Sequence, residues 1–350
     1  MPAADDSGKP LRVLMITSEW PKPGVSITPH FIKRQAEFLQ AAGIDVDVFD
    51  FRGERRFRNY ATAWLGVQRR LAASHYDLVH AQFGQSGVLA LPKRLPLVVT
   101  MRGSDVLGIV GPDGRHLRKG KLLQAASRLV ARRADAVIAV SEHMRPHIGA
   151  DIPVQVIPSG IDFDLFRPID QAEARHRLGL PLDEKIIVFV GKPAQPRKRF
   201  WLAQQAVEVL SRTMPVRLHV AWARPHDEIP WHLAAADVLL FTSMQEGSPN
   251  AVKEALACNL PVVSVNVGDV PERLASIEGC ELCQNELPET IATALERSLR
   301  RGSRVEGRAA VRHLDERNIT EQVIAVYNRV LKHERLSGAR TQGETVATTA

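Results

Sequence analysis

Ten short apolar runs alternate with segments of helical periodicity, and this alternation limits the possible folds more than any other feature of the sequence. The runs lie at residues 11–17, 44–51, 77–82, 96–101, 135–140 and 154–158, and again at 185–191, 216–222, 236–243 and 261–268. They are rich in Val, Ile and Leu and show little polar alternation, which indicates strands buried on both faces of a parallel sheet. Helices must then form the crossover connections. The sequence therefore predicts an α/β protein.

The pattern restarts after residues 161–168, which read "IDFDLFRP", and 350 residues are enough for two domains. We expect a first Rossmann-like domain at 1–167 and a second at 168–316, facing one another across a cleft. A helix at about 317–333 should complete the first domain, and the small, polar residues of 334–350 predict a disordered tail. In open parallel sheets, ligands bind beyond the carboxyl ends of the strands, so functional residues are expected there.

The excess of positive over negative charge lies entirely in the first part of the chain. Residues 1–160 hold 22 Lys and Arg against 14 Asp and Glu, whereas the remaining 190 hold 24 against 25. This asymmetry predicts an anionic partner for the first domain, although exposed arginines also serve solubility alone. The first ten residues lack the features of a secretory signal, and no apolar run approaches the ~20 residues that span a bilayer. We expect a cytoplasmic protein.

Three cysteines are too few for a zinc site built on the Cys280-x-x-Cys283 pair, because no second pair of ligands stands at the required spacing. Reduced, partly buried thiols are expected instead. Asp162 and Asp164 spell Asp-x-Asp, a pattern that binds manganese in some enzymes. Here the pair lies between the two domains, and we interpret it as a turn and cap element. No metal is expected.

The segment "EGSPNAVKE" at residues 246–254 follows a predicted strand and begins a helix. Ser248 is suited to the N-cap and Pro249 to the first helical position. The free N–H groups near Asn250 then form an anion site, with Glu246 and Glu254 on either side. Carboxylates repel phosphate and bind neutral hydroxyls, so this layout suits a nucleotide sugar. The alternative is structural, because acidic residues near a helix N-terminus also stabilise its dipole.

Other strand ends carry further candidates. Gly191 and Lys192 end one strand and Lys198 follows, so both lysines could meet a diphosphate; a solvated basic loop is the alternative. Arg102 and Asp105 follow another strand, where Asp105 could simply pair with the guanidinium. Gly24 allows close backbone approach to phosphate or acceptor, and His80 could contact the acceptor or serve as a core or capping histidine.

These segments resemble the family 4 glycosyltransferases, retaining enzymes of the GT-B fold. The resemblance rests first on Glu246 and Glu254 with seven residues between them, followed by "ALACNLPVVSVNVGDVPE". It extends to four earlier segments, "SEWPKPGVSITPHFIKRQAEFL", "VTMRGSDV", "VSEHM" and "VIPSGIDFDLFRP". It implies that Glu246 contacts the transferred sugar and Glu254 the ribose. Backbone amides of Gly247, Ser248, Pro249 and Asn250 would hold sugar and phosphate.

The chain departs from the family pattern at several positions. Lys192 replaces an Arg after Gly191, Arg199 replaces a Gly, and Arg102 stands where the family often has His. Where the family usually has a longer segment near the nucleobase of the donor, this chain has only "RPHDEIP", so the identity of the base is not predicted. Lys keeps the charge of Arg without its bidentate geometry.

The resemblance implies transfer of a sugar from a nucleotide diphosphate sugar to a glycan or lipid-linked acceptor, without a metal or nucleic acid. The charge asymmetry adds an anionic membrane surface as a predicted partner, with peripheral attachment to its inner face. Two alternatives remain: a sugar-nucleotide epimerase of the same fold, and a non-catalytic nucleotide-sugar-binding protein. A dehydrogenase is disfavoured, because no G-x-G-x-x-G follows the first strand.

Overall fold

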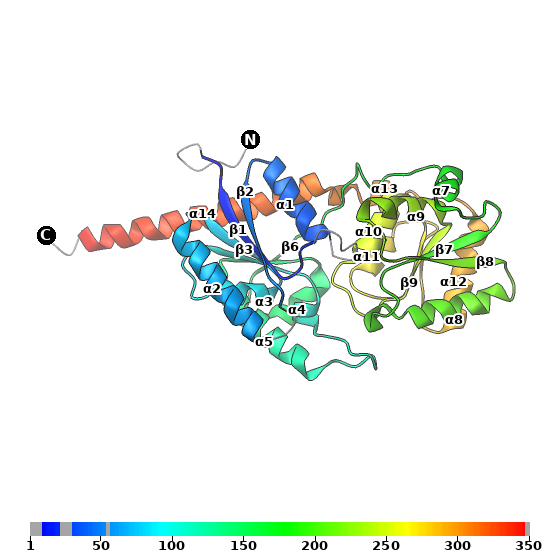
Figure 1. The fold of residues 1–350 in the computed structure, drawn as a ribbon, viewed down its shortest axis with the longest axis horizontal. Coiled ribbons are helices and arrows are strands. Elements are labelled where there is room, and N and C mark those ends of the chain that lie inside the picture. Colours follow the sequence, from blue (N-terminus) through cyan, green and yellow to red (C-terminus); the bar gives the residue numbers. More distant parts are fainter. Residues whose placement is uncertain (1–8, 22–29, 54–56, 347–350) are drawn as a thin grey trace.

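The computed structural model describes residues 9–21, 30–53 and 57–346, which form two α/β domains lying end to end (Figure 1). Within these residues, the first domain holds a six-stranded parallel sheet of order β2-β1-β3-β4-β5-β6. Its strands are β1 (Arg12–Thr17), β2 (Asp45–Asp50), β3 (Leu78–Gln82), β4 (Leu97–Met101), β5 (Ala136–Ala139) and β6 (Val154–Val156).

Helices connect these strands and cover the sheet. They are α1 (Phe31–Ala41), α2 (Phe57–Ala73), α3 (Gly84–Gly87), η1 (Val88–Ala90), α4 (Ser104–Leu107), α5 (Arg118–Arg133), η2 (Glu142–Met144) and α6 (Arg145–Ile148). The helix α1 buries Ile32, Ala36 and Leu39 against the sheet and ends before Gly43, whose φ of 89° suits glycine.

The second domain repeats the plan with five strands of order β11-β10-β9-β7-β8. Its strands are β7 (Lys185–Val190), β8 (Val216–Ala221), β9 (Val238–Phe241), β10 (Val262–Ser264) and β11 (Glu281–Leu282). Its helices are α7 (Gln171–Leu178), η3 (Pro196–Lys198), α8 (Phe200–Ser211), η4 (His226–Glu228), α9 (Ile229–Ala235), α10 (Asn250–Ala257), α11 (Val270–Leu274), α12 (Pro288–Arg301), α13 (Gly307–Ala310) and η5 (Arg312–Leu314).

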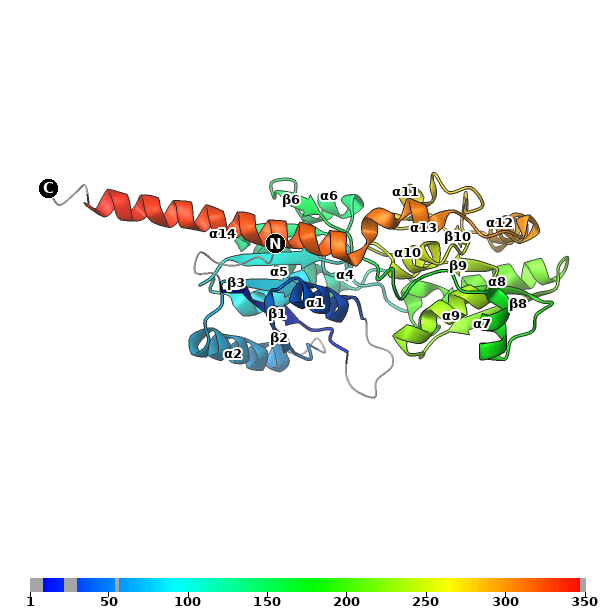
Figure 2. The same ribbon diagram turned by 90° about the horizontal axis from the view of Figure 1, so that it is seen from above.

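The last helix, α14 (Glu316–Val346), returns from the second domain and runs along the first (Figure 2). At its start, Glu316 accepts a hydrogen bond from Arg34 of α1 at 3.0 Å. Further along, the Tyr327 hydroxyl meets Nδ1 of His80 on β3 at 2.7 Å. The helix therefore packs on the first domain although it follows the second in sequence.

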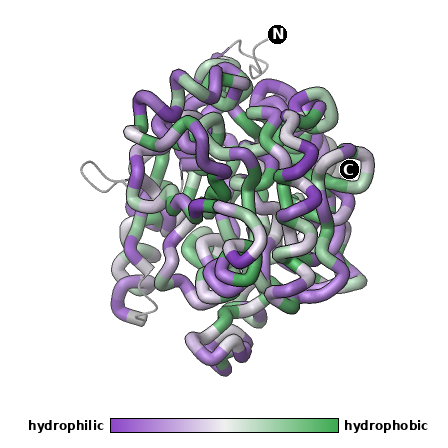
Figure 3. The backbone as a smooth tube through the Cα atoms, turned by 90° about the vertical axis from the view of Figure 1, so that its right-hand side faces the viewer, coloured by the Kyte–Doolittle hydropathy of each residue, from purple (hydrophilic) through white to green (hydrophobic). Residues whose placement is uncertain are grey.

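Apolar segments gather in the interior and hydrophilic segments form most of the periphery, as Figure 3 shows from the side of the second domain. Leu14 and Ile16 on one face of β1, and Val13 and Met15 on the other, are all fully buried. Burial of successive residues on both faces explains why these strands read as continuous apolar runs.

Every predicted strand segment contains a strand, so the α/β class with two parallel sheets is confirmed. The strand β11 was missed, because two residues carry no readable pattern. The predicted boundary at 168 falls between β6 and β7. The segment 334–346, expected to be disordered, continues α14 instead. The glycines and threonines of this segment extend a helix poorly, which is why it reads as a tail, whereas a helix that is already nucleated gains a hydrogen bond with each further residue.

Candidate functional site

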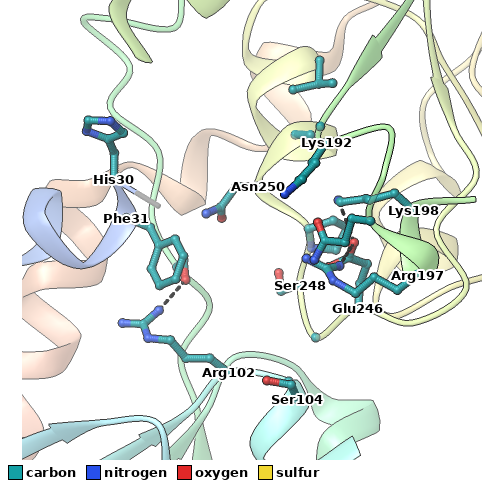
Figure 4. Close-up of a pocket in the computed structure, with 18 of the residues that line it drawn as sticks. His30, Phe31, Arg102, Ser104, Lys192, Arg197, Lys198, Glu246, Ser248 and Asn250 are labelled. Atoms are coloured by element: carbon teal, nitrogen blue, oxygen red, sulfur yellow. Dashed lines mark hydrogen bonds and ion pairs between the residues drawn. The ribbon is translucent and has the colours of Figure 1, made fainter. Parts of the chain in front are cut away.

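A cavity of about 750 Å³ lies between the carboxyl ends of the two sheets. From the first domain it is lined by Glu19, His30, Phe31, Arg102, Ser104 and Ser159, and from the second by Gly191, Lys192, Lys198, Trp222, Glu246, Asn250 and Glu254, among others. Figure 4 shows Phe31 and Arg102 on one side, with Lys198 and Glu246 across the opening. This volume suits a ligand of nucleotide-sugar size.

The structure gathers most of the predicted site residues into this one cavity. Those that line it are Arg102, Gly191, Lys192, Lys198, Glu246, Gly247, Ser248, Pro249, Asn250 and Glu254. Two predicted residues, His80 and Asp105, do not line it, and Gly24 lies outside the described residues. The strand-end rule therefore selected residues that share one cavity, and it also included two residues that serve the fold.

The helix α10 begins one residue later than predicted. Pro249 occupies the N-cap position, and Asn250 is the first helical residue. The Ser248 hydroxyl does not cap the helix, because it donates to Oδ2 of Asp269 at 2.8 Å. Without a side-chain cap, the N–H groups of the first turn remain available to an anion. The Oδ1 atom of Asn250 is also buried without a partner.

Glu246 is held by two cations of η3. Its Oε1 accepts from Nζ of Lys198 at 2.8 Å and from Nη1 of Arg197. Burial alone would raise the pKa of Glu246, but the charges of Lys198 and Arg197 outweigh it and lower the pKa to about 2. Burial lowers the pKa of Lys198, and the Glu246 carboxylate opposes this. Glu246 is therefore ionised at neutral pH and fixed in direction.

Lys192 differs from Lys198 in having no acidic partner. Among the described residues, no carboxylate lies within ion-pair distance of its ammonium, which instead lies 5.9 Å from the centre of the Trp222 ring. It follows Gly191, whose φ of 142° favours glycine and lets the chain turn into the cavity. Lys192 is thus a cation free to bind an anionic ligand.

Glu254 lies one turn inside α10 and only 6% of its surface is exposed. Burial raises the pKa of its carboxyl, while Arg34 and Lys253 oppose the rise. Nη1 of Arg34 lies 3.8 Å from Oε1 of Glu254. The long separation leaves the carboxylate free to accept hydrogen bonds from a ligand.

Arg102 and Asp105 do not form the side-chain pair that the sequence suggested. The Arg102 guanidinium donates to Gln82, Gln35 and Ser159 and lies 4.7 Å from the centre of the Phe31 ring. Burial lowers the pKa of Arg102 to about 10, so it stays charged at neutral pH.

The Asp105 carboxylate accepts instead from three backbone N–H groups, those of Gly84, Arg102 and Gly103, at 3.0, 3.1 and 2.8 Å. It therefore shapes the turn after β4. These three amides satisfy the buried carboxylate without a side-chain partner.

His80 is a core residue. Its ring is fully buried between Tyr327 and Thr100, at 2.7 and 2.8 Å. Burial and the charge of Arg102 lower the pKa of His80 to about 3, so the ring is neutral. Of the two interpretations of His80, the structural one is correct.

Among the lining residues that the sequence analysis did not single out, three carry ionisable groups of interest: Glu19, Arg197 and His226. Glu19 comes two residues after β1, so the strand-end rule could have found it. Burial raises its pKa, and Arg102 and Arg197 oppose the rise. His226 stacks on His30 with ring centres 4.8 Å apart, a contact between domains that no local pattern shows.

Asp162 and Asp164 form a turn, as predicted. Oδ1 of Asp162 accepts from the N–H groups of Asp164 and Leu165 at 3.0 and 3.1 Å, and Asp164 pairs with Arg317. The cysteines are free thiols, with Cys258 and Cys283 buried and Cys280 half-buried. Of the helices in the described ranges, none is both long and apolar enough to cross a membrane.

Both halves of the chain match known glycosyltransferase families. The sequence profile of Glycosyltransferase Family 4 matches residues 25–165, and that of Glycosyl transferases group 1 matches residues 186–301. The chain is 28% identical to a Bacillus subtilis protein named as the teichuronic acid biosynthesis glycosyltransferase TuaC, over 74% of this chain and 82% of that protein. It is also 28% identical to the D-inositol 3-phosphate glycosyltransferase of Mycobacterium tuberculosis, over 78% of this chain and 66% of the relative.

Solved structures show the same fold. Sucrose-phosphate synthase from Thermosynechococcus elongatus superposes with a TM-score of 0.70 at 19% identity, covering 97% of this chain and 100% of that one. Anabaena HepE in complex with UDP-glucose gives a TM-score of 0.60 at 19% identity, covering 94% and 100%. Both are similarities of architecture.

Proposed function

The chain belongs to the family 4 glycosyltransferases of the GT-B fold, and on that premise we propose that it transfers a sugar from a nucleotide diphosphate sugar with retention of configuration. The observation that carries the proposal is the position of two carboxylates. Glu246 and Glu254 line the same cavity, with the uncapped N-terminus of α10 between them. A diphosphate at the helix terminus would place hydroxyl-bearing groups at both carboxylates.

Each part of the donor has a matching group. Glu254 accepts hydrogen bonds from the ribose, and Glu246, ionised and fixed by Arg197 and Lys198, accepts them from the transferred sugar. The amides of the 247–250 segment and the ammonium of Lys192 bind the diphosphate. HepE, which shares the fold, is solved with UDP-glucose, which supports a donor of this class.

The chemistry is departure of the nucleoside diphosphate and attack by an acceptor hydroxyl on the same face of the sugar. The bond between the anomeric carbon and the phosphate oxygen breaks, and that oxygen takes the acceptor proton. Lys192, Lys198 and the α10 terminus stabilise the charge that develops on the diphosphate, a role that other enzymes give to a metal ion. Three side chains hold the Arg102 guanidinium in the first-domain wall of the cavity, where it adds a fixed positive charge.

The acceptor is proposed to be a glycan or a lipid-linked glycan used in polysaccharide or glycolipid synthesis. It would enter from the first domain, whose wall of the cavity is formed by His30, Phe31, Arg102 and Ser104. The name of the Bacillus relative, which refers to teichuronic acid biosynthesis, supports this class of product. The basic first domain supports a cytoplasmic protein attached peripherally to the membrane.

Calorimetry with two variants tests the assignment. Glu254→Gln should weaken free nucleoside diphosphate and sugar donor equally, by about 1.5–3 kcal/mol, the value of a charged hydrogen bond. Glu246→Gln should weaken the sugar donor and leave the free diphosphate unchanged. The reverse pattern would show that the roles are exchanged. Thermal-shift screening of nucleotide sugars identifies the donor first, because ligand binding raises the melting temperature by mass action.

Two other outcomes would replace the proposal. Conversion of the donor to an epimer in the absence of acceptor would assign the cavity to an epimerase. Donor binding with no transfer to any acceptor pool would indicate a nucleotide-sugar-binding protein, in which the pairing of Lys198 with Glu246 has become structural.

A further inference from the structure

The helix α5 has two apolar faces, and only one of them is covered by protein. Its inner face buries Ser127, Val130 and Ala131 in the first domain. On its outer face, Leu122 is 76% exposed and Leu129 is 47% exposed. Because an α-helix turns 100° per residue, positions 122, 125 and 129 form one line on the outside.

Basic residues border this line on both sides. The exposed ones within the helix are Arg118, Lys119, Lys121, Arg128, Arg132 and Arg133. The chain has no acidic residue between Asp113 and Asp135. In the part of the chain that the structure describes, Arg132 pairs with Asp151 at 3.4 Å, whereas Lys119 and Lys121 have no carboxylate within ion-pair distance. The outer face of α5 thus joins apolar side chains to uncompensated positive charge.

The exposed leucines of the second domain lack this setting. In the second domain, Leu182 precedes Asp183 and Glu184, and Leu287 follows Glu286. Single exposed leucines are ordinary on protein surfaces. A line of leucines with basic flanks is instead the pattern of a helix that lies in a membrane interface.

We propose that the outer face of α5 docks on an anionic phospholipid bilayer, with Leu122 and Leu129 inserted below the headgroups and the flanking Lys and Arg residues against the lipid phosphates. The helix lies at the lower edge of the first domain in Figure 1, where its outer face is open. A nucleic acid would use the positive charge but has no use for the exposed leucines, and so it fits the surface less well.

The helix that carries the docked face packs, through its inner side, on an element of the cavity wall. Nε2 of Gln124 on α5 donates to the carbonyl oxygen of Val106 on α4 at 2.8 Å, and the α4 residues Ser104 and Leu107 line the cavity. A lipid-linked acceptor in that bilayer would therefore lie one helix away from the cavity wall. This last step rests on the proposed function, whereas the docking itself does not.

Co-sedimentation of the full chain with vesicles tests the docking. Vesicles of phosphatidylglycerol mixed with phosphatidylcholine should bind the protein, and phosphatidylcholine vesicles should bind it much less. Raising the salt concentration should weaken binding, because charge at a surface is screened. Leu122→Ser with Leu129→Ser should lower partition by about tenfold per leucine. Lys119→Glu with Lys121→Glu should lower it by at least about fivefold per residue.

Matched controls lie in the second domain. Leu182→Ser with Leu287→Ser removes two leucines of comparable exposure, 53% and 58%, and Arg212→Glu with Arg312→Glu changes the net charge by the same amount. Both should bind vesicles as wild type does. All eight leucine and charge positions are exposed, and thermal unfolding checks that each variant folds.

The proposal is overturned if wild type ignores anionic vesicles, or if the α5 variants bind no more weakly than their controls. It is also overturned if Leu122→Ser with Leu129→Ser converts a dimer to a monomer in sedimentation velocity with vesicle binding unchanged, since α5 would then be an interface between copies. Donor calorimetry on the same proteins separates this result from the proposed function. Failure of donor binding leaves the vesicle result standing, and failure of vesicle binding leaves donor binding standing.

Discussion

The backbone of Gly247 in the second domain lies against the carbonyl oxygen of Arg102 in the first, so closely that a Cβ at residue 247 would lie 2.4 Å from that oxygen. Two hydrogen bonds reinforce the contact: the Ser141 hydroxyl donates to the Gly247 carbonyl at 2.9 Å, and Gln245 donates to the Gly108 carbonyl at 2.8 Å. The loop that carries Glu246 is therefore positioned by the first domain as well as by its own.

Gly247→Ala should strongly reduce sugar transfer. The new methyl group meets a backbone oxygen at a distance that real Cβ atoms do not show, so the two domains must separate at this point. A displacement of about 1 Å at a site of group transfer can cost on the order of 10² in rate. Steady-state kinetics with the donor and acceptor identified by screening measures the loss.

Gly179→Ala is the control for this variant. Gly179 is the C-cap of α7, with φ of 65° and no atom within 4 Å of an added Cβ. Its replacement should cost stability through backbone strain, about 1–2 kcal/mol, and leave kcat unchanged. Equal activity of Gly247→Ala and wild type would show that the Arg102 contact is not needed during turnover.

Lys198→Ala should lower kcat by on the order of 10²–10³, more than it lowers donor affinity, because its charge matters most as the diphosphate departs. The structure adds a second reason, since Lys198 also fixes Glu246 at 2.8 Å. Arg197→Ala removes the other cation on the same carboxylate and serves as the comparison. If the two variants have the same kinetics, Lys198 acts only by orienting Glu246. Wild-type turnover in Lys198→Ala would make the "PRKR" segment a solvated loop.

The sequence predicted the strands, and it placed the candidate site at residues that share one cavity, because both follow from local patterns. The burial of β1 on both faces produces an apolar run that can be read directly. The same reasoning placed Lys192, Glu246 and Glu254 at one cleft, because parallel strands bring their carboxyl ends together.

The partners within the site were less predictable, because they depend on contacts between segments far apart in the chain. Arg102 binds Gln35 and Gln82, which belong to α1 and β3, so the nearby Asp105 was wrongly favoured as its partner. His80 stands near a strand end, so the sequence made it a candidate, yet it is covered by Tyr327 of α14, which lies 247 residues further along the chain.

Sugar transfer should survive removal of divalent metal. We expect the diphosphate charge to be met by the α10 terminus and by Lys192, which are present without any added ion. The Asp162 and Asp164 side chains are committed to a turn and to Arg317. Transfer assayed with excess EDTA should match the untreated rate. Complete loss of transfer with EDTA and recovery with manganese would contradict this prediction and make Asp162 and Asp164 candidate metal ligands again.

Stability should rise with pH through the titration of a buried lysine. Lys253 is fully buried in α10, and its Nζ donates to the Ser159 carbonyl oxygen at 2.7 Å. Burial, helped by the charges of Arg273 and Arg34 and opposed by those of Asp269 and Glu254, lowers the pKa of Lys253 from 10.5 to about 7 in the folded protein. Between pH 7 and 10.5 the unfolded chain therefore binds a proton that the folded chain does not.

Because unfolding takes up that proton, the free energy of unfolding gains a term that increases with pH across this window, at most about 1.4 kcal/mol per pH unit. Lys253→Met keeps the length of the side chain and removes the term. The difference between wild type and variant should therefore shift steadily in favour of wild type from pH 7 to 10.5. Urea unfolding at several pH values measures it.

The comparison must be made as a difference, because burial raises the pKa values of Cys258, Cys280 and Cys283 to about 11 or 12, which makes the folded state lose stability as pH rises through the ordinary thiol range. Both proteins share that effect, so it cancels. Lys332→Met, at an exposed lysine of α14, should track wild type at every pH. If Lys253→Met also runs parallel to wild type, Lys253 is charged in the folded protein up to the pH at which it is charged in the unfolded chain, and its bond to Ser159 is that of an ammonium.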